Sequence, residues 1–248
     1  MLLAAAIAIV FLAAIVRGYS GFGFSLLAIT ALSLLYAPAT IIPSIFLLEI
    51  AASIHLLPGL WRDIHWRSLI PLVIGTGIGT PIGLTFLTTV PAAPMQIALG
   101  LFVFAATCLL WIGFALKSMP GNTASIGAGL AAGVANGAFG IGGPPVILFY
   151  FASPAGNVVG RATLVTYFLL TDAIGLVFLA RENLVTADSL FRTLTFLPAL
   201  LAGVWLGARS FKSADPVIFR KCVLALLGLL AMITSVKGIY ALSVGNQV

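Results

Sequence analysis

Long apolar runs separated by short polar breaks dominate the chain. Cutting the sequence at charges, prolines and glycines gives the runs 1–16, 21–36, 41–60, 68–88, 95–116, 124–139, 143–152, 160–180, 190–208 and 217–240. A helix needs about 20 residues to cross the hydrocarbon core of a bilayer. Six runs are long enough to predict full transmembrane helices: 41–60, 68–88, 95–116, 160–180, 190–208 and 217–240.

The other four runs form two pairs, each interrupted by a cluster of glycines. Runs 1–16 and 21–36 meet at Arg17-Gly18-Tyr19-Ser20-Gly21-Phe22-Gly23. Runs 124–139 and 143–152 meet at Asn136-Gly137-Ala138-Phe139-Gly140-Ile141-Gly142-Gly143-Pro144-Pro145. As one continuous helix, residues 124–152 would reach about 44 Å, which is too short to cross a core of about 30 Å twice. We therefore expect hairpins of short helices whose tips lie inside the membrane.

The basic residues between the apolar runs favour these hairpins. If each pair returns to the side where it began, one side of the membrane carries Arg62, Arg67, Lys117, Arg161, Arg209, Lys212, Arg220 and Lys221. The other side then carries Arg181, Arg192 and Lys237. A single crossing by each pair would divide the same residues almost evenly. Cytoplasmic loops carry an excess of Lys and Arg, so we expect both termini outside and residues 61–67 inside.

The two halves of the chain resemble each other. We treat 1–248 as one transmembrane domain made of a first repeat, 1–117, and a second repeat, 118–248. The motif around Arg17 recurs around Asn136, 119 residues later, and Glu49 matches Asp172, 123 residues later. The patterns Gly79-x-x-x-Gly83 and Gly203-x-x-x-Gly207 also match, and we interpret both as close helix packing.

These features together predict an all-α integral membrane protein with two inverted repeats. Each repeat would contain one glycine-broken hairpin and three full transmembrane helices, and an odd number of crossings inverts the second copy relative to the first. Inverted repeats whose broken helices meet near the midplane are typical of secondary transporters. We expect alternating access, in which the two repeats rock about the central tips.

The composition supports a membrane protein and excludes several other classes. Hydrophobic residues make up 61% of the chain and charged residues 7%, with a mean hydropathy of +1.20. An ordinary soluble domain has about 25% charged residues. The net charge of +6 comes from basic loops and does not indicate binding of nucleic acid. The sequence has no nucleotide-binding motif, catalytic constellation or metal-ligand cluster, so we expect neither an enzyme nor a cofactor.

The glycine motifs also carry a family resemblance. Asn136–Pro145, with its weaker copy Gly18–Phe24, resembles the sulfite exporter TauE/SafE family of permeases, and the resemblance extends over nearly the whole chain. It implies a multi-pass permease of the bacterial or archaeal inner membrane. Members are linked to export of sulfite, sulfoacetate and related anions, and to uptake of some sulfonates. The implied partners are a small anionic substrate and the lipid bilayer, and a homo-oligomer is compatible with the sequence.

The glycine tips are the candidate substrate site. Non-helical backbone inside a membrane is tolerated only where protein or a water-filled cavity surrounds it. A helix that restarts after a tip points its N–H groups and partial positive charge at the break, which suits an anion. The predicted substrate-binding residues are Arg17, Gly18, Ser20, Gly21, Gly23, Asn136, Gly137, Gly140, Gly142, Gly143, Pro144 and Tyr167.

Three charged residues have open alternatives. The guanidinium fork of Arg17 suits the three oxygens of sulfite or a sulfonate, but a snorkelling side chain is equally compatible with the sequence. Glu49 and Asp172 are the only acids within the six full spans. They are candidates for proton coupling, for pairing with Arg17 or Arg161, or for capping a polar network. A rival function is a cation or metal-ion permease that uses Glu49 and Asp172 as ligands.

Overall fold

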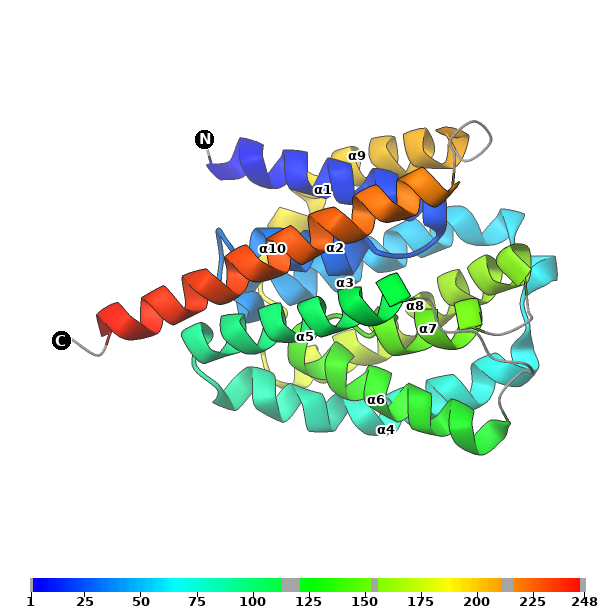
Figure 1. The fold of residues 1–248 in the computed structure, drawn as a ribbon, viewed down its shortest axis with the longest axis horizontal. Coiled ribbons are helices and arrows are strands. Elements are labelled where there is room, and N and C mark those ends of the chain that lie inside the picture. The colour runs from blue at the N-terminus through cyan, green and yellow to red at the C-terminus, as the bar shows by residue number, and fades with distance from the viewer. Residues whose placement is uncertain (1, 113–120, 153–155, 211–215, 246–248) are drawn as a thin grey trace.

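The computed structural model describes residues 2–112, 121–152, 156–210 and 216–245 (Figure 1). No residue in these ranges forms a strand, which agrees with the predicted all-α class. The helices are α1 (Leu2–Ser20), α2 (Phe24–Leu32), α3 (Pro38–Leu56), α4 (Trp66–Thr89), α5 (Ala92–Ile112), α6 (Asn122–Phe139), α7 (Gly143–Ala152), α8 (Gly156–Arg181), α9 (Ala187–Ser210) and α10 (Pro216–Gly245). Two short 3-10 helices, η1 (Leu57–Gly59) and η2 (Trp61–Asp63), connect α3 to α4.

Within the described ranges, seven helices are long and apolar enough to cross a membrane. Six of them confirm the predicted spans: Pro38–Gly59, Trp66–Thr89, Ala92–Ile112, Val158–Arg181, Ala187–Arg209 and Val223–Ser243. The seventh is Leu2–Ser20. Large apolar side chains cover the outer faces of these helices. Along α4, for example, Ile70, Ile74, Ile78 and Ile82 are each about half exposed at four-residue spacing, as expected for a face in contact with lipid.

The first arm is longer than the sequence predicts. The expected run ends at residue 16, but α1 continues through Arg17 to Ser20 and reaches spanning length. Gly18 does not end the helix because it packs against α9, where a Cβ on Gly18 would overlap the carbonyl oxygen of Val204. The helical path ends only at Gly21 and Gly23, whose φ angles of 81° and 89° lie in the left-handed region that glycine adopts without strain.

Both glycine-broken segments are hairpins. After the first break, α2 returns towards the end of the molecule where both termini lie (Figure 1). The Gln96 side chain near the start of α5 donates to the carbonyl of Ser33, and Lys237 in α10 donates to that of Leu34. After the second break, α7 returns to the start of α4, where the hydroxyl groups of Tyr150 and Ser68 are 2.8 Å apart. Neither α2 nor α7 is long enough to span a bilayer.

Because both segments are hairpins, the described basic residues are divided unequally between the two ends of the molecule. The end formed by η1, η2 and the start of α8 carries Arg62, Arg67, Arg161, Arg209 and Lys221. The opposite end carries Arg181, Arg192 and Lys237. Lys117, Lys212 and the side chain of Arg220 lie outside the described part of the chain. This distribution matches the one expected for hairpins, and the assignment of the more basic end to the cytoplasm stays a prediction.

Two glycine-lined helix pairs flank the centre of the molecule. α4 packs along α6, and a Cβ on Gly79 would overlap the carbonyl oxygen of Leu130. α1 packs along α9, where a Cβ on Gly207 would overlap that of Ile15. The interpretation of these glycine patterns as packing motifs is therefore confirmed. Each pair joins one helix from either half of the sequence, while the inversion of the repeats and their boundary stay predictions.

Between these pairs, α3 packs against α8. These two helices have the largest buried shares of the seven candidate spans, and they carry Glu49 and Asp172. The tips of both hairpins meet this central pair.

Candidate functional site

Arg17 lies at the end of α1, beside the first glycine tip, and its side chain is fully buried. Its Nη2 is 3.1 Å from Oε2 of Glu49 and donates a hydrogen bond of 2.7 Å to Oγ of Ser53. Its Nη1 donates to the carbonyl oxygen of Gly21 at 2.8 Å. The predicted pairing of Arg17 with Glu49 is confirmed, and the snorkelling alternative is wrong because the guanidinium is held inside the protein.

The Glu49 carboxylate occupies the start of α2. Its Oε1 accepts hydrogen bonds from the backbone N–H of Ser25, at 3.1 Å, and from the Ser25 hydroxyl, at 3.0 Å. Ser25 is the second residue of α2, in the turn whose N–H groups have no partner within the helix. An anionic group of the protein itself therefore fills the position that the sequence predicts for a substrate anion at this tip.

The second tip carries a weaker version of the same arrangement. Asn136 stands where the first tip has Arg17, and its amide faces the carboxylate of Asp172. Both side chains are buried, yet neither Nδ2 of Asn136 nor Oδ2 of Asp172 has a hydrogen-bond partner of standard geometry among the described residues. Pro144 stands 119 residues after Ser25 and has neither an N–H nor a hydroxyl to donate. The second carboxylate consequently has neither an adjacent guanidinium nor the donors of Ser25, and the Asn136 amide is the polar group beside it.

We call the groups at the first tip (Arg17, Ser25 and Glu49) and those at the second tip (Asn136 and Asp172) the two half-sites. They are close enough to interact electrostatically. Asp172 interacts with the charges of Glu49 and Arg17, and Arg161 with that of Arg17. The Arg161 guanidinium reaches the first tip from α8 and donates to the carbonyl oxygen of Gly18 at 2.9 Å. Two guanidinium groups and two carboxyl groups therefore converge around the tips, within an otherwise apolar bundle.

Phe168 lies between the two tips. Its ring centroid is 5.0 Å from Cζ of Arg17, so the guanidinium lies over the aromatic face. The same ring approaches the second tip at Gly143. The sequence alone does not single out Phe168, because one phenylalanine in an apolar helix carries no distinguishing signal. Ser53 is also absent from the predicted residues, although its hydroxyl lies one helical turn after Glu49, a signal that could have identified it.

The remaining predicted residues lie at or next to the tips in different roles. Ser20 closes the first tip through its own backbone, donating to the carbonyl of Val16 and accepting from the N–H of Phe22. Gly137 packs against α4, where a Cβ would overlap the carbonyl oxygen of Thr80. The predicted residues Gly140, Gly142 and Pro144 are buried at the second tip.

Tyr167 is fully buried next to Phe168 on α8. Its hydroxyl is 2.7 Å from Oγ1 of Thr76 on α4, and Tyr167 interacts electrostatically with Asp172. The tyrosine therefore links α8 to α4 beside the second half-site. Binding of a substrate by Tyr167 and by the tip residues stays a prediction.

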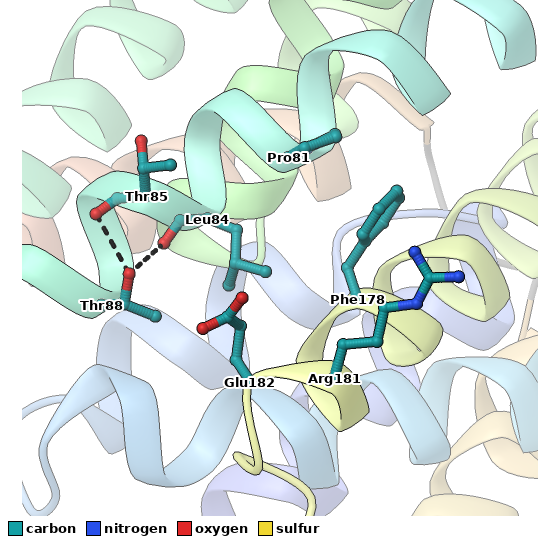
Figure 2. Close-up of a pocket in the computed structure, with 7 residues that line it drawn as sticks. All are labelled: Pro81, Leu84, Thr85, Thr88, Phe178, Arg181 and Glu182. Carbon is teal, nitrogen blue, oxygen red and sulfur yellow. Dashed lines mark hydrogen bonds between the residues drawn. The ribbon is translucent and has the colours of Figure 1, made fainter.

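A separate cavity of about 300 Å³ lies between α4 and the end of α8 (Figure 2). It is lined by Pro81, Leu84, Thr85, Thr88, Phe178, Arg181 and Glu182. Figure 2 shows the Arg181 guanidinium beside the ring of Phe178, and Cζ of Arg181 is 5.7 Å from the centroid of that ring. None of the predicted site residues lines this cavity, so it is distinct from the site at the tips.

Comparison with known proteins identifies the family. The model of the family "Sulfite exporter TauE/SafE" matches residues 6–234. A "Probable sulfite/organosulfonate exporter TauE" of Cupriavidus necator is 26% identical over 218 residues, covering 84% of each chain. A "Probable inner membrane transporter protein TsaS" of Comamonas testosteroni is 28% identical over 193 residues, covering 74% of this chain and 77% of that protein.

No solved structure matches the chain significantly. The family match extends over both glycine tips and all of the predicted spans except the end of the last. This chain is therefore a multi-pass membrane transporter, not an enzyme, and belongs to the sulfite exporter TauE/SafE family.

Proposed function

We propose that this protein transports small sulfur-containing anions, such as sulfite, sulfoacetate or sulfonates, across the inner membrane by alternating access, with linkage to protons. The observation that carries the proposal is the fully buried Arg17 at the first glycine tip. A charge inside a membrane helix is costly unless it has a partner, and such residues mark substrate pathways. The fork of N–H groups on a guanidinium suits the oxygens of a sulfite or sulfonate group.

The substrate anion would replace Glu49 at this site. In the structure, Glu49 forms an ion pair with Arg17 and accepts two hydrogen bonds from Ser25. A sulfonate or sulfite oxygen can accept the same hydrogen bonds, so binding would exchange one anion for another without leaving the guanidinium unpaired. Arg161 lies beside Arg17 and adds a second positive charge, which favours an anion over a cation at the tip.

The helix packing suggests which parts move during alternating access. A motion of one whole repeat against the other would separate α1 from α9 and α4 from α6, whose backbones meet at glycines. We instead assign the pairs α1–α9 and α4–α6 to two moving bodies, each containing a helix from both repeats. The central tips and the pair α3–α8 lie between these bodies, where a shift would expose the anion first to one side and then to the other.

Transport by purified protein in proteoliposomes tests the proposal. Labelled sulfite, sulfoacetate and taurine would be compared with nickel, each with and without a pH gradient. Arg17→Lys keeps the charge but loses the fork, and we expect it to reduce saturable anion flux by at least about tenfold. Arg209→Lys is the matched control, since Arg209 is exposed at the end of α9, and it should transport like the wild type.

Two results would overturn the proposal. Flux of nickel without flux of any anion would indicate a cation permease that uses Glu49 and Asp172. Equal anion flux in Arg17→Lys and Arg209→Lys would remove Arg17 from the substrate site.

A further inference from the structure

We infer that Asp172 carries the proton linked to anion transport, while Glu49 is the exchangeable partner of Arg17. This inference rests on the proposed function and assigns its proton linkage to one residue. It follows from a difference between two half-sites that the sequence repeat would make equivalent.

The Glu49 carboxylate has a cation and two hydrogen-bond donors beside it. Its Oε2 lies 3.1 Å from the Arg17 guanidinium, and its Oε1 accepts two hydrogen bonds from Ser25. Hydrogen bonds and an adjacent cation both favour the charged form of a carboxyl group. The first tip therefore surrounds Glu49 with groups that stabilise a negative charge.

Asp172 is buried to a similar degree without those partners. Its exposed fraction is 3%, and its Oδ2 has no hydrogen-bond partner of standard geometry among the described residues. In the same part of the chain no guanidinium lies in salt-bridge contact with it, unlike the one beside Glu49. An uncompensated charge in a low-dielectric interior is strongly unfavourable, and a buried carboxyl group becomes neutral instead. A protonated Asp172 can also donate a hydrogen bond to the side-chain oxygen of Asn136, once the Asn136 amide is turned so that its oxygen faces Asp172.

Among the charged groups around Asp172, the stronger effect favours the neutral form. α3 contributes Glu49, whose negative charge disfavours ionisation, and α1 contributes Arg17, whose positive charge acts in the opposite direction but is balanced by Glu49. On α8 itself, Tyr167 and Arg161 are the other titratable side chains near the cluster, and Arg161 lies towards Arg17. α7 contributes only Tyr150, α6 contains no titratable side chain, and the only one on α4 is the exposed Arg67.

The sequence explains why the two half-sites differ. At the second tip, Asn136 replaces the guanidinium of Arg17, and Pro144 replaces the N–H and hydroxyl of Ser25. Both changes remove groups that would stabilise an ionised Asp172. Because they act on the same carboxyl group, the second half-site is suited to hold a proton and the first to hold an anion.

Anion binding and protonation of Asp172 then strengthen each other. When a substrate anion binds to Arg17, it brings a further negative charge close to Asp172. By linkage, protonation of Asp172 raises the affinity for the anion by the same factor as anion binding raises the affinity of Asp172 for the proton. We expect the KM for sulfite to rise with pH, by at most about tenfold per pH unit for one linked proton, across the range in which Asp172 titrates.

Counterflow of labelled sulfite in proteoliposomes, measured across a pH series at zero membrane potential, tests the assignment. Asp172→Asn mimics the neutral side chain and should retain counterflow, with a KM that no longer depends on pH and no accumulation driven by a pH gradient. Glu49→Gln makes the same chemical change at the other half-site and should keep a pH dependence, moved to lower pH because the negative charge that favours neutral Asp172 is lost. Asp188→Asn changes an exposed acid at the start of α9 and should behave like the wild type.

A second variant keeps Asp172 and changes its surroundings. Pro144→Ser restores the donors that Ser25 provides at the first tip, so it should stabilise the ionised form and move the rise in KM to lower pH. An unchanged pH profile in a folded Pro144→Ser protein would count against the assignment.

Other outcomes would overturn it directly. Proton-driven accumulation that survives in Asp172→Asn, a pH dependence that disappears in Glu49→Gln instead, or wild-type flux driven by a sodium gradient would each do so. The wild-type measurement separates this inference from the proposed function. Absence of anion counterflow in the wild type would reject the function and the proton assignment with it, whereas counterflow without any response to pH would reject the assignment alone.

Discussion

Replacement of Glu49 by glutamine should lower the stability of the free protein and raise its affinity for the substrate anion. Both side chains of the Arg17–Glu49 pair are almost fully buried, and their charged atoms are 3.1 Å apart. Removing one partner of a buried ion pair costs about 3–5 kcal/mol, because the other charge stays buried without compensation. Glutamine keeps the shape of the side chain and an oxygen for Ser25, so the lost charge is the main change.

The affinity for an anion should rise for the same reason. A bound sulfite or sulfonate would compensate Arg17 again and would no longer compete with an internal carboxylate. Recovery of only about 1.4 kcal/mol of the lost stabilisation corresponds to a tenfold lower Kd. We therefore expect Glu49→Gln to bind sulfite at least about tenfold more tightly than the wild type.

Two measurements on purified protein check this prediction. Isothermal titration gives the Kd for sulfite, and thermal unfolding with and without sulfite gives the stability of the free and bound forms. Glu49→Gln should have a lower Tm than the wild type without ligand and a larger increase in Tm with it. Glu182→Gln, at an exposed position after α8, is the control and should change neither. A folded Glu49→Gln protein with equal or weaker affinity would refute the idea that Glu49 competes with the substrate.

Three further changes have definite expected effects on thermal stability. Gly79→Ala should lower the Tm through a loss of about 1–3 kcal/mol in stability, because its Cβ would overlap the backbone of α6. Gly77→Ala, on the open side of α4, is the control and should be neutral or slightly stabilising. Equal effects of the two changes would contradict the packing role of Gly79. Gly23→Ala should cost about 1–2 kcal/mol, because an L-residue is strained at a φ of 89°, and an unchanged Tm would show that the tip relaxes. Ser53→Ala should cost about 1.5–3 kcal/mol by removing the 2.7 Å acceptor of Arg17; a sulfite titration that also changed more than a few-fold would show that Ser53 contacts the anion.

The spans and the tips were predictable because their signals are local. A run of about 20 apolar residues has few stable locations other than a bilayer, and clustered glycines mark helix breaks. The extent of α1 was not predictable in this way. Whether Gly18 ends the helix depends on the backbone of α9, which is about 190 residues away in the sequence.

The connections within the site depend on contacts between distant helices. The sequence left open whether the acids pair with Arg17 or with Arg161. Only the folded chain, which brings the side chain of Arg17 to Glu49 on α3, decides for this pair. The repeat did suggest that the two half-sites are equivalent in position. Their hydrogen bonding differs because Asn136 stands in place of Arg17 and Pro144 in place of Ser25. The sequence alone does not show that the second replacement matters, because the hydrogen bonds from Ser25 to Glu49 are visible only in the structure.

A structure of the protein with bound sulfite would test the central claim most directly. We predict that the anion lies at the first glycine tip, within hydrogen-bonding distance of Arg17 and Ser25, and that the Glu49 side chain has left both of them. An intact Arg17–Glu49 pair with sulfite bound elsewhere, for example in the cavity beside Arg181, would contradict the account.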